Sequence, residues 1–212
     1  MSTHNAVAPR NRAATLPVLV VAAVFVAALA ALVVTLINDD ESAATNFDGD
    51  VAAVEGNALA ALPADGADPA VGQEAPVVEG RGLTGKEVTA PVAGKPTVVL
   101  FLAHWCPHCQ REVPLVQDYV DAGRVPEGAG LVAVATAMDP ARTNYPASSW
   151  LEREGWTSPV LADGNDEAAN AYGLPAFPYW VAVDADGRIV ERRTGELTPR
   201  QIDQLFAAAK AG

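Results

Sequence analysis

The chain has 212 residues, half of them apolar, and a formal net charge of −12. This length and composition predict one or at most two domains with a buried core, although alanine supplies much of the apolar fraction. The acidity argues against a nucleic-acid-binding protein, because such proteins neutralise phosphates with clustered Lys and Arg. Two cysteines, Cys106 and Cys109, are too few for a scaffold held together by disulfides.

The first predicted element is an uncharged apolar run, Leu16–Ile37. As a helix it is about 33 Å long, which is enough for a bilayer core of about 30 Å. Arg10 and Arg12 precede it and acidic residues 39–41 follow it, so we expect residues 1–15 in the cytoplasm and the rest outside. The predicted partner of this transmembrane anchor is the lipid bilayer.

A cleaved signal peptide is the alternative, but its apolar region is usually shorter and ends in a small-residue cleavage site. Both interpretations place residues 38–212 outside the cytoplasm, where disulfides persist. Residues 38–70 are rich in Ala, Gly, Asp and Pro and contain no Lys or Arg. We expect an acidic flexible tether there, because such a segment buries too little apolar surface to offset its chain entropy.

Residues 71–212 are predicted to form a single domain. The expected elements, in chain order, are a buried strand at 96–103, a helix from the cysteines to about 122, a strand at 131–137, helices ending at Gly155 and Gly173, a hairpin around Asp186-Gly187, and a C-terminal helix that begins with a capping box at Thr198, Pro199 and Gln201. A parallel pair of strands joined by a helix, followed by a hairpin, predicts an α/β fold. Its central sheet would be mixed, with helices on both faces.

The segment HWCPHCQREVP, residues 104–114, contains both cysteines, and three uses compete for them. A zinc site usually takes four Cys or His ligands, and four ligands within six residues cannot easily surround one ion. A copper chaperone would want a distant third ligand, but no His follows His108. A structural disulfide across three residues would close too small a loop to add much stability. No metal site is therefore predicted.

A redox pair explains the segment better. A buried strand would deliver Cys106 to a helix N-terminus, where free N–H groups and the helix dipole favour a thiolate nucleophile. Cys109 would lie one turn further on, more buried, and able to resolve a mixed disulfide. Pro107 suits the first helical turn. His108 would either stabilise the thiolate or lie exposed with little effect, and Trp105 would give the site an apolar side.

The segment VVLFLAHWCPHCQREVP resembles the active site of thioredoxin-fold proteins, specifically the membrane-anchored TlpA/ResA/DsbE-like thiol-disulfide oxidoreductases. The matching motif residues are Trp105, Cys106, Cys109, Glu112 and Pro114. Upstream VGQEAPVVEGRGLTGKEV and downstream AYGLPAFPYWVAVDADGRIV also resemble that family, so the similarity spans about residues 71–210. It implies a thioredoxin-like fold, the enzyme activity of the family, and no cofactor besides a redox-active Cys106–Cys109 disulfide.

The resemblance makes Pro178 the counterpart of a cis-proline that faces the cysteines. Phe177 would then offer its carbonyl and amide to an extended substrate chain; an ordinary trans proline that opens a strand is the alternative. Glu112 is implied to be a buried carboxylate that tunes the cysteines, or else a surface charge. Two residues depart from the pattern: Leu100 replaces a buried Asp found in many thioredoxins, and Phe177 is larger than the usual residue.

The direction of electron flow is open at this point. The Pro107-His108 dipeptide resembles that of DsbA-type oxidants, so we favour oxidative folding or general exchange with thiols or disulfides of substrate proteins. The family resemblance instead favours a reductant for cytochrome c maturation or metal-centre assembly. Either direction implies a membrane redox partner, a quinone-linked oxidase or an electron-delivering thiol transporter. A rival of another class is a non-catalytic module that binds or delivers a metal.

Overall fold

The computed structural model describes residues 47–212. The predicted transmembrane anchor Leu16–Ile37, the residues before it, and the first part of the expected tether, 38–46, lie outside the described residues. Within residues 47–212, no helix combines the length and the apolar character needed to cross a membrane.

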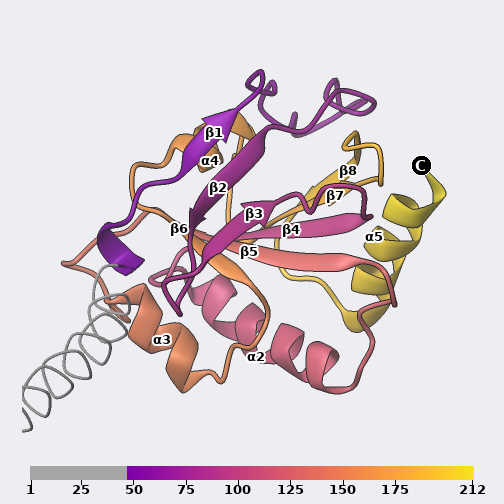
Figure 1. The fold of residues 1–212 in the computed structure, drawn as a ribbon. Helices are drawn as coiled ribbons and strands as arrows, with labels where there is room; N and C mark the ends of the chain where they lie inside the picture. Colours follow the sequence, from indigo (N-terminus) through magenta and orange to yellow (C-terminus); the bar gives the residue numbers. More distant parts are fainter. Residues whose placement is uncertain (1–46) are drawn as a thin grey trace, which may run out of the picture. The chain divides into compact units, whose positions relative to one another are not determined.

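Strands and helices alternate along most of the described chain (Figure 1). In chain order the elements are η1 (Phe47–Gly49), β1 (Ala53–Glu55), β2 (Val77–Arg81), β3 (Glu87–Ala90), β4 (Thr97–Leu102), α2 (Pro107–Asp121), β5 (Gly130–Thr136), α3 (Ala147–Arg153), β6 (Val160–Asp163), α4 (Glu167–Ala171), β7 (Tyr179–Val183), β8 (Ile189–Thr194) and α5 (Pro199–Ala211). Helix α2 begins directly after Cys106 and continues through Pro114.

The central sheet has the strand order β6-β5-β4-β7-β8. Strands β6, β5 and β4 are parallel, while β7 runs antiparallel to β4 and β8 antiparallel to β7. Strand β4 occupies the centre, and all six of its residues are buried, as the unbroken apolar run predicts. The predicted mixed sheet is therefore confirmed, with the strand that precedes the cysteines at its middle.

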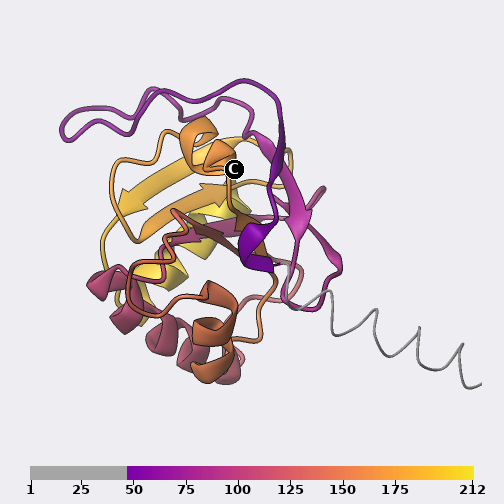
Figure 2. The same cartoon turned by 90° about the vertical axis from the view of Figure 1, so that its left-hand side faces the viewer.

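The two faces of β4 pack into different halves of the core because successive side chains of a strand point to opposite sides. Leu100 and Leu102 pack with side chains from α2, α3 and α5. Val99 and Phe101 pack on the other face, with α4 and the small sheet of β1, β2 and β3. Figures 1 and 2 show α2 and α3 together on one side of the sheet and the small sheet away from them.

Most of the predicted elements are present within a few residues of their expected bounds. The hairpin turns at Asp186-Gly187, and Thr198 and Gln201 form the reciprocal capping box at the start of α5. The pattern did not predict β6 or the antiparallel sheet β1-β2-β3. Those strands have three to five residues, and β2 alternates exposed with buried side chains around Glu79, so no long apolar run marks them.

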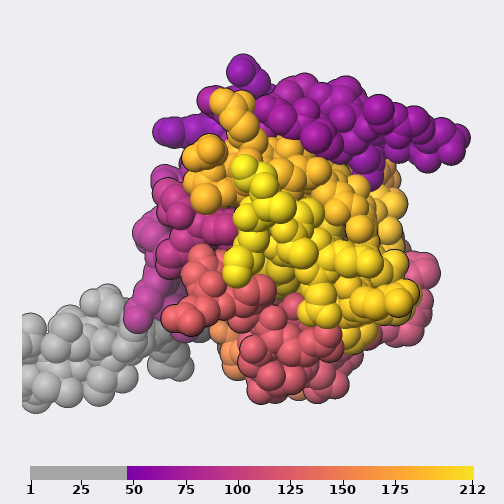
Figure 3. All heavy atoms as spheres, turned by 90° about the vertical axis from the view of Figure 1, so that its right-hand side faces the viewer, coloured from indigo at the N-terminus to yellow at the C-terminus, as the bar shows by residue number. Residues whose placement is uncertain are grey.

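Residues 47–76, which we call the N-terminal strap, pack against the domain, whereas the composition predicts a flexible tether up to residue 70. Phe47 and Leu59 are buried, and the Leu59 amide donates to the Ala171 carbonyl at 2.7 Å. Figure 3 shows the strap, in indigo to purple, lying over the C-terminal part of the chain. Residues 47–70 are therefore packed rather than extended away from the domain, since these few apolar side chains find distant partners.

A buried ion pair fixes the middle of the strap. The Arg192 guanidinium, whose side chain is fully buried, donates to both carboxylate oxygens of Asp68 and to the carbonyls of Ala60 and Tyr172. Its hydrogen bonds hold the pKa of Asp68 below the usual value. The strap is thus attached through a charge that has no access to water.

We predict that Asp68→Asn lowers the free energy of unfolding by about 3 kcal/mol, because it leaves the Arg192 charge buried without a counter-ion. Urea denaturation of the full-length chain measures this, with Asp65→Asn as the control: Asp65 is an exposed acidic residue of the same strap. Equal stabilities of the two variants would contradict the prediction.

Candidate active site

Strand β4 delivers Cys106 to the N-terminus of α2. Cys106 has extended backbone angles, φ −74° and ψ 119°, and its carbonyl accepts the first helical hydrogen bond, from the Gln110 amide at 3.0 Å. Pro107 occupies the first helical position, and no acidic side chain lies in that turn. The helix dipole and the free amides at this end favour a negative charge on the Cys106 sulfur.

The two cysteines are present as free thiols with unequal exposure. Cys106 retains 6% of its surface, while Cys109 has none. Burial, together with the nearby charges of Cys106 and Glu112, raises the pKa of Cys109 far above the usual value for a thiol. The pair therefore contains one accessible sulfur and one that stays protonated until a base or a reaction partner acts on it.

Glu112 faces the core from α2, one turn after Cys109, and is 1% exposed. Its Oε1 accepts a hydrogen bond of 3.0 Å from the Leu197 amide, which precedes α5. Burial raises the pKa of Glu112 to about 7, and the charge of Glu196 adds to the effect. A carboxyl group with this pKa can exchange a proton at neutral pH next to a thiol that must lose one.

His108 and Arg111 lie on the exposed side of α2 and share one partner. The carboxylate of Glu196, in the turn between β8 and α5, is 2.6 Å from His108 Nδ1 and 2.5 Å from Arg111 Nη2. These hydrogen bonds lower the pKa of Glu196 and raise that of Arg111, which the charge of Cys106 raises further. The Arg111 guanidinium and the His108 imidazole are therefore held by one carboxylate, and Arg111 Nη2 also lies 2.8 Å from His108 Nδ1.

Trp105 and His104 attach the loop of residues 137–146 to the cysteine segment. The Trp105 indole donates to the Ala137 carbonyl at 2.8 Å. His104 is buried; its Nδ1 donates to the Thr143 carbonyl at 2.8 Å, and its Nε2 accepts from the Asp139 amide at 3.1 Å. His104 thus joins the cysteine segment to two backbone groups of this loop.

The rim of the site beside Cys106 is aromatic. Phe177 meets Trp105 edge-to-face, with ring centroids 6.0 Å apart, and the guanidinium of Arg142 lies 4.0 Å from the centroid of the Trp105 ring. The Phe177–Pro178 peptide bond is cis, as the family resemblance implies. The Pro178 carbonyl accepts from the Gly195 amide, so the residue before Glu196 also contacts this loop.

The predicted catalytic, redox-tuning and substrate-binding residues all lie in this region, either in the segment 105–112 or in the loop at 177–178. The sequence did not point to Arg111, Arg142 or Glu196. Arg111 lies inside the recognised segment, but Arg142 and Glu196 belong to distant loops, and neither a motif nor a periodic pattern marks them. Only the folded chain shows that they adjoin Trp105 and His108.

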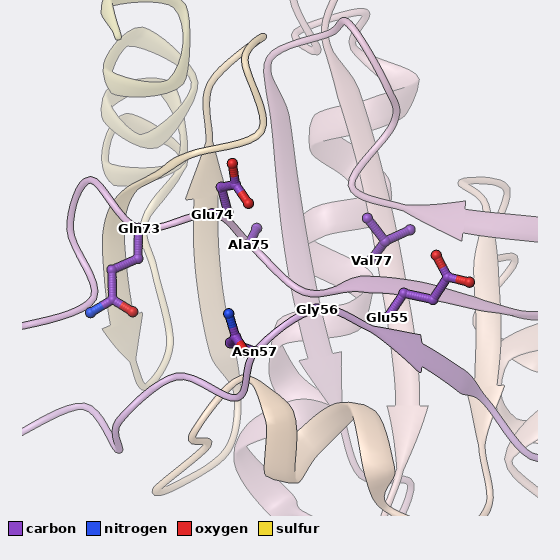
Figure 4. A pocket seen from close by; sticks show the side chains of 7 residues that line it. All are labelled: Glu55, Gly56, Asn57, Gln73, Glu74, Ala75 and Val77. Atoms are coloured by element: carbon purple, nitrogen blue, oxygen red, sulfur yellow. The ribbon is translucent and has the colours of Figure 1, made fainter.

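The described residues contain no group of three or more His, Cys, Asp or Glu side chains arranged to hold a metal ion. A separate hollow of about 500 Å³ lies between β1 and the start of β2 (Figure 4). It is lined by Glu55, Gly56, Asn57, Gln73, Glu74, Ala75 and Val77. None of these is a predicted site residue, so the hollow is distinct from the cysteine site.

The central strand of a mixed sheet leads here into a Cys-x-x-Cys helix, and a cis-proline precedes the neighbouring strand β7. These features define a thioredoxin-like redox protein. The Redoxin family model matches residues 70–208, most of the described domain. The chain therefore belongs to the Redoxin family and is a thiol-disulfide oxidoreductase of the thioredoxin type.

Relatives and solved structures agree with this assignment. The thiol-disulfide oxidoreductase ResA of Geobacillus thermodenitrificans is 28% identical over 66% of this chain and 79% of that protein. Sporulation thiol-disulfide oxidoreductase A of Bacillus subtilis is 22% identical over 58% and 73%. Two crystal structures share the fold. StoA from B. subtilis has a TM-score of 0.55 and 24% identity, and the match covers 65% of this chain and 98% of StoA. A DsbF homologue from Corynebacterium diphtheriae has a TM-score of 0.58 and 19% identity, and the match covers 72% of this chain and 99% of the homologue.

We predict that Glu112→Gln stabilises the protein at pH 8 by on the order of 3 kcal/mol and has little effect at pH 4. The pKa of Glu112 is about 7 in the folded chain and about 4.3 in an unfolded one, so its stabilising contribution is complete below pH 4 and is lost as the pH rises to 7. Gln cannot ionise and still accepts the Leu197 amide. Urea denaturation at both pH values checks this, and a difference that did not change with pH would contradict it.

Proposed function

We propose that this protein exchanges disulfides with substrate proteins outside the cytoplasm through Cys106 and Cys109. The observation that carries the proposal is the asymmetry of the pair. Cys106 lies at a helix N-terminus and retains 6% of its surface, while Cys109 has none and its pKa is raised. An accessible thiolate attacks first, and a protonated thiol beside it reacts only after the first bond has formed.

In the reducing direction, the Cys106 thiolate attacks one sulfur of a substrate disulfide. A mixed disulfide forms and one substrate thiolate leaves. Cys109 then loses its proton, to Glu112 in our proposal, and attacks the Cys106 sulfur. The Cys106–Cys109 disulfide forms and the second substrate thiolate leaves. Two electrons pass from the enzyme dithiol to the substrate, and a dithiol protein at the membrane restores the reduced enzyme.

Phe177 and Pro178 are proposed to bind the substrate chain. The Phe177 ring lies against Trp105, which directly precedes Cys106. The Phe177 carbonyl and amide would pair with an extended segment next to the reacting sulfur. The exposed Arg142 adds a positive charge over the Trp105 ring.

The charges around Cys106 support reduction over the oxidative folding that the Pro107-His108 dipeptide favours. An oxidant needs a strongly stabilised thiolate, because its reduced form must be the stable one. Here His108 and Arg111 both contact the Glu196 carboxylate, which offsets their attraction for that thiolate. We therefore propose a reductant of extracytoplasmic protein disulfides, with oxidative folding as the second candidate.

We predict that Cys106→Ala abolishes exchange, while Cys109→Ala accumulates mixed disulfides with substrate proteins because nothing resolves them. Non-reducing electrophoresis of the variants, with and without dithiothreitol, measures the trapped species. The double variant is the control and should trap nothing. If Cys109→Ala trapped no partner and Cys106→Ala did, the assigned roles would be reversed.

The proposed location rests on the apolar run Leu16–Ile37 with Arg10 and Arg12 before it. We predict that the full-length chain stays with membranes after alkaline carbonate extraction. Its reduced Cys106 should react with a membrane-impermeant maleimide once the outer face of the cytoplasmic membrane is accessible. Release by carbonate would contradict the anchor, and protection of Cys106 from the reagent would contradict the topology.

A further inference from the structure

Glu196 lies at the meeting point of the elements that form the cysteine site. Its carboxylate contacts His108 and Arg111, both in the first turns of α2. The amide of the next residue, Leu197, donates to Glu112. The amide of the preceding residue, Gly195, donates to the Pro178 carbonyl at 2.8 Å. Three consecutive residues of one turn thus contact four proposed site residues from two other segments.

This turn is also fixed in place from outside the site. The Gly195 carbonyl accepts from the Trp180 indole at 3.2 Å. On the other side, the capping box of Thr198 and Gln201 sets where α5 begins. Glu196 therefore projects from an anchored backbone, and its side chain is 37% exposed, less than that of either His108 or Arg111.

We propose that Glu196 is a positioning residue that sets the redox equilibrium of the Cys106–Cys109 pair. It acts by holding His108 and Arg111 to its own carboxylate, which makes the site more reducing than the same helix would be without it. The inference rests on the proposed role of Cys106 as the nucleophile and names the residue that sets the direction of exchange.

The direction in which Glu196 shifts the redox equilibrium follows from the charges of the reduced and oxidised sites. In the reduced site Cys106 can ionise to the thiolate that attacks a disulfide, whereas the Cys106–Cys109 disulfide carries no charge. Cations free to face the sulfur stabilise only the reduced state and make the pair an oxidant. A carboxylate that pairs with those cations removes this preference. Arg111 lies in the first turns of the helix that Cys106 caps, and the charge of Cys106 contributes to the raised pKa of its guanidinium.

The test compares Glu196→Gln with Glu127→Gln in the full-length chain. Glu127 is an exposed acid between α2 and β5, in the loop that leads to the start of β5, away from the ends of the strands that carry the site. Both variants therefore lose one negative charge, but only one loses it beside the cysteines. The equilibrium with glutathione redox buffers measures the fraction of dithiol, and the pH dependence of alkylation measures the reactivity of Cys106.

We expect Glu196→Gln to shift the glutathione equilibrium toward the dithiol about tenfold, which corresponds to about 30 mV. Its alkylation midpoint should move to lower pH, and both shifts should shrink in high salt because the cluster is partly exposed. Arg111→Gln, with Glu196 intact, should shift the equilibrium in the opposite direction. Glu127→Gln should match the wild type.

An unchanged equilibrium in Glu196→Gln, or equal shifts in Glu196→Gln and Glu127→Gln, would overturn the inference. A loss of stability in Glu196→Gln without a change in potential would assign the residue a structural role only and overturn it as well. These outcomes are distinct from failure of the proposed function, in which the wild-type chain itself forms no reversible Cys106–Cys109 disulfide in glutathione buffers.

Discussion

The burial of β4 on both faces is the constraint on which the rest of the structure depends. All six of its residues pair with β5 on one side and five of them pair with β7 on the other, so the strand cannot slide without breaking both ladders. The chain must therefore leave the sheet at one defined point, and Cys106 lies four residues after it. Helix α2 starts there because Pro107 fits its first position, and Leu100 and Leu102 hold the helix against the sheet.

Around Cys106, the chemistry depends on which charged side chains are paired and which are buried. The chain is acidic as a whole, yet the site obtains its acids from particular positions: Glu112 inside the core and Glu196 on the surface. The buried carboxyl takes up a proton near neutral pH, whereas the exposed one stays ionised beside Arg111 and His108. In our proposal, Glu112 accepts the proton of Cys109, and Glu196 offsets the positive charge near Cys106. Glu112 lies on the buried side of α2 and Glu196 contacts its exposed side, so the two carboxylates would act on different cysteines.

Residues 47–76 show where prediction from composition fails. The part of this segment up to residue 70 was expected to be a tether because it has few large apolar side chains, but Phe47 and Leu59 are buried and Asp68 reaches Arg192 across 124 positions of sequence. The short strands β2 and β6 were missed for a related reason. Each is stabilised by pairing with neighbouring strands, and neither has a sequence pattern long enough to predict a strand. By contrast, β4, α2, the hairpin and α5 were predictable because their signals are local.

The sequence by itself determined the nature of the chemistry. Two cysteines three residues apart, after a buried strand and around a Pro-His pair, specify a redox helix because strand, turn and helix signals all act within a few residues. Only the tertiary structure decided how that helix is tuned. Glu196 meets His108 across 88 positions, and His104 meets Thr143 across 39. Neither residue propensity nor hydrophobic periodicity predicts such pairs, because each pair forms only when the folded sheet brings separate loops to the same edge.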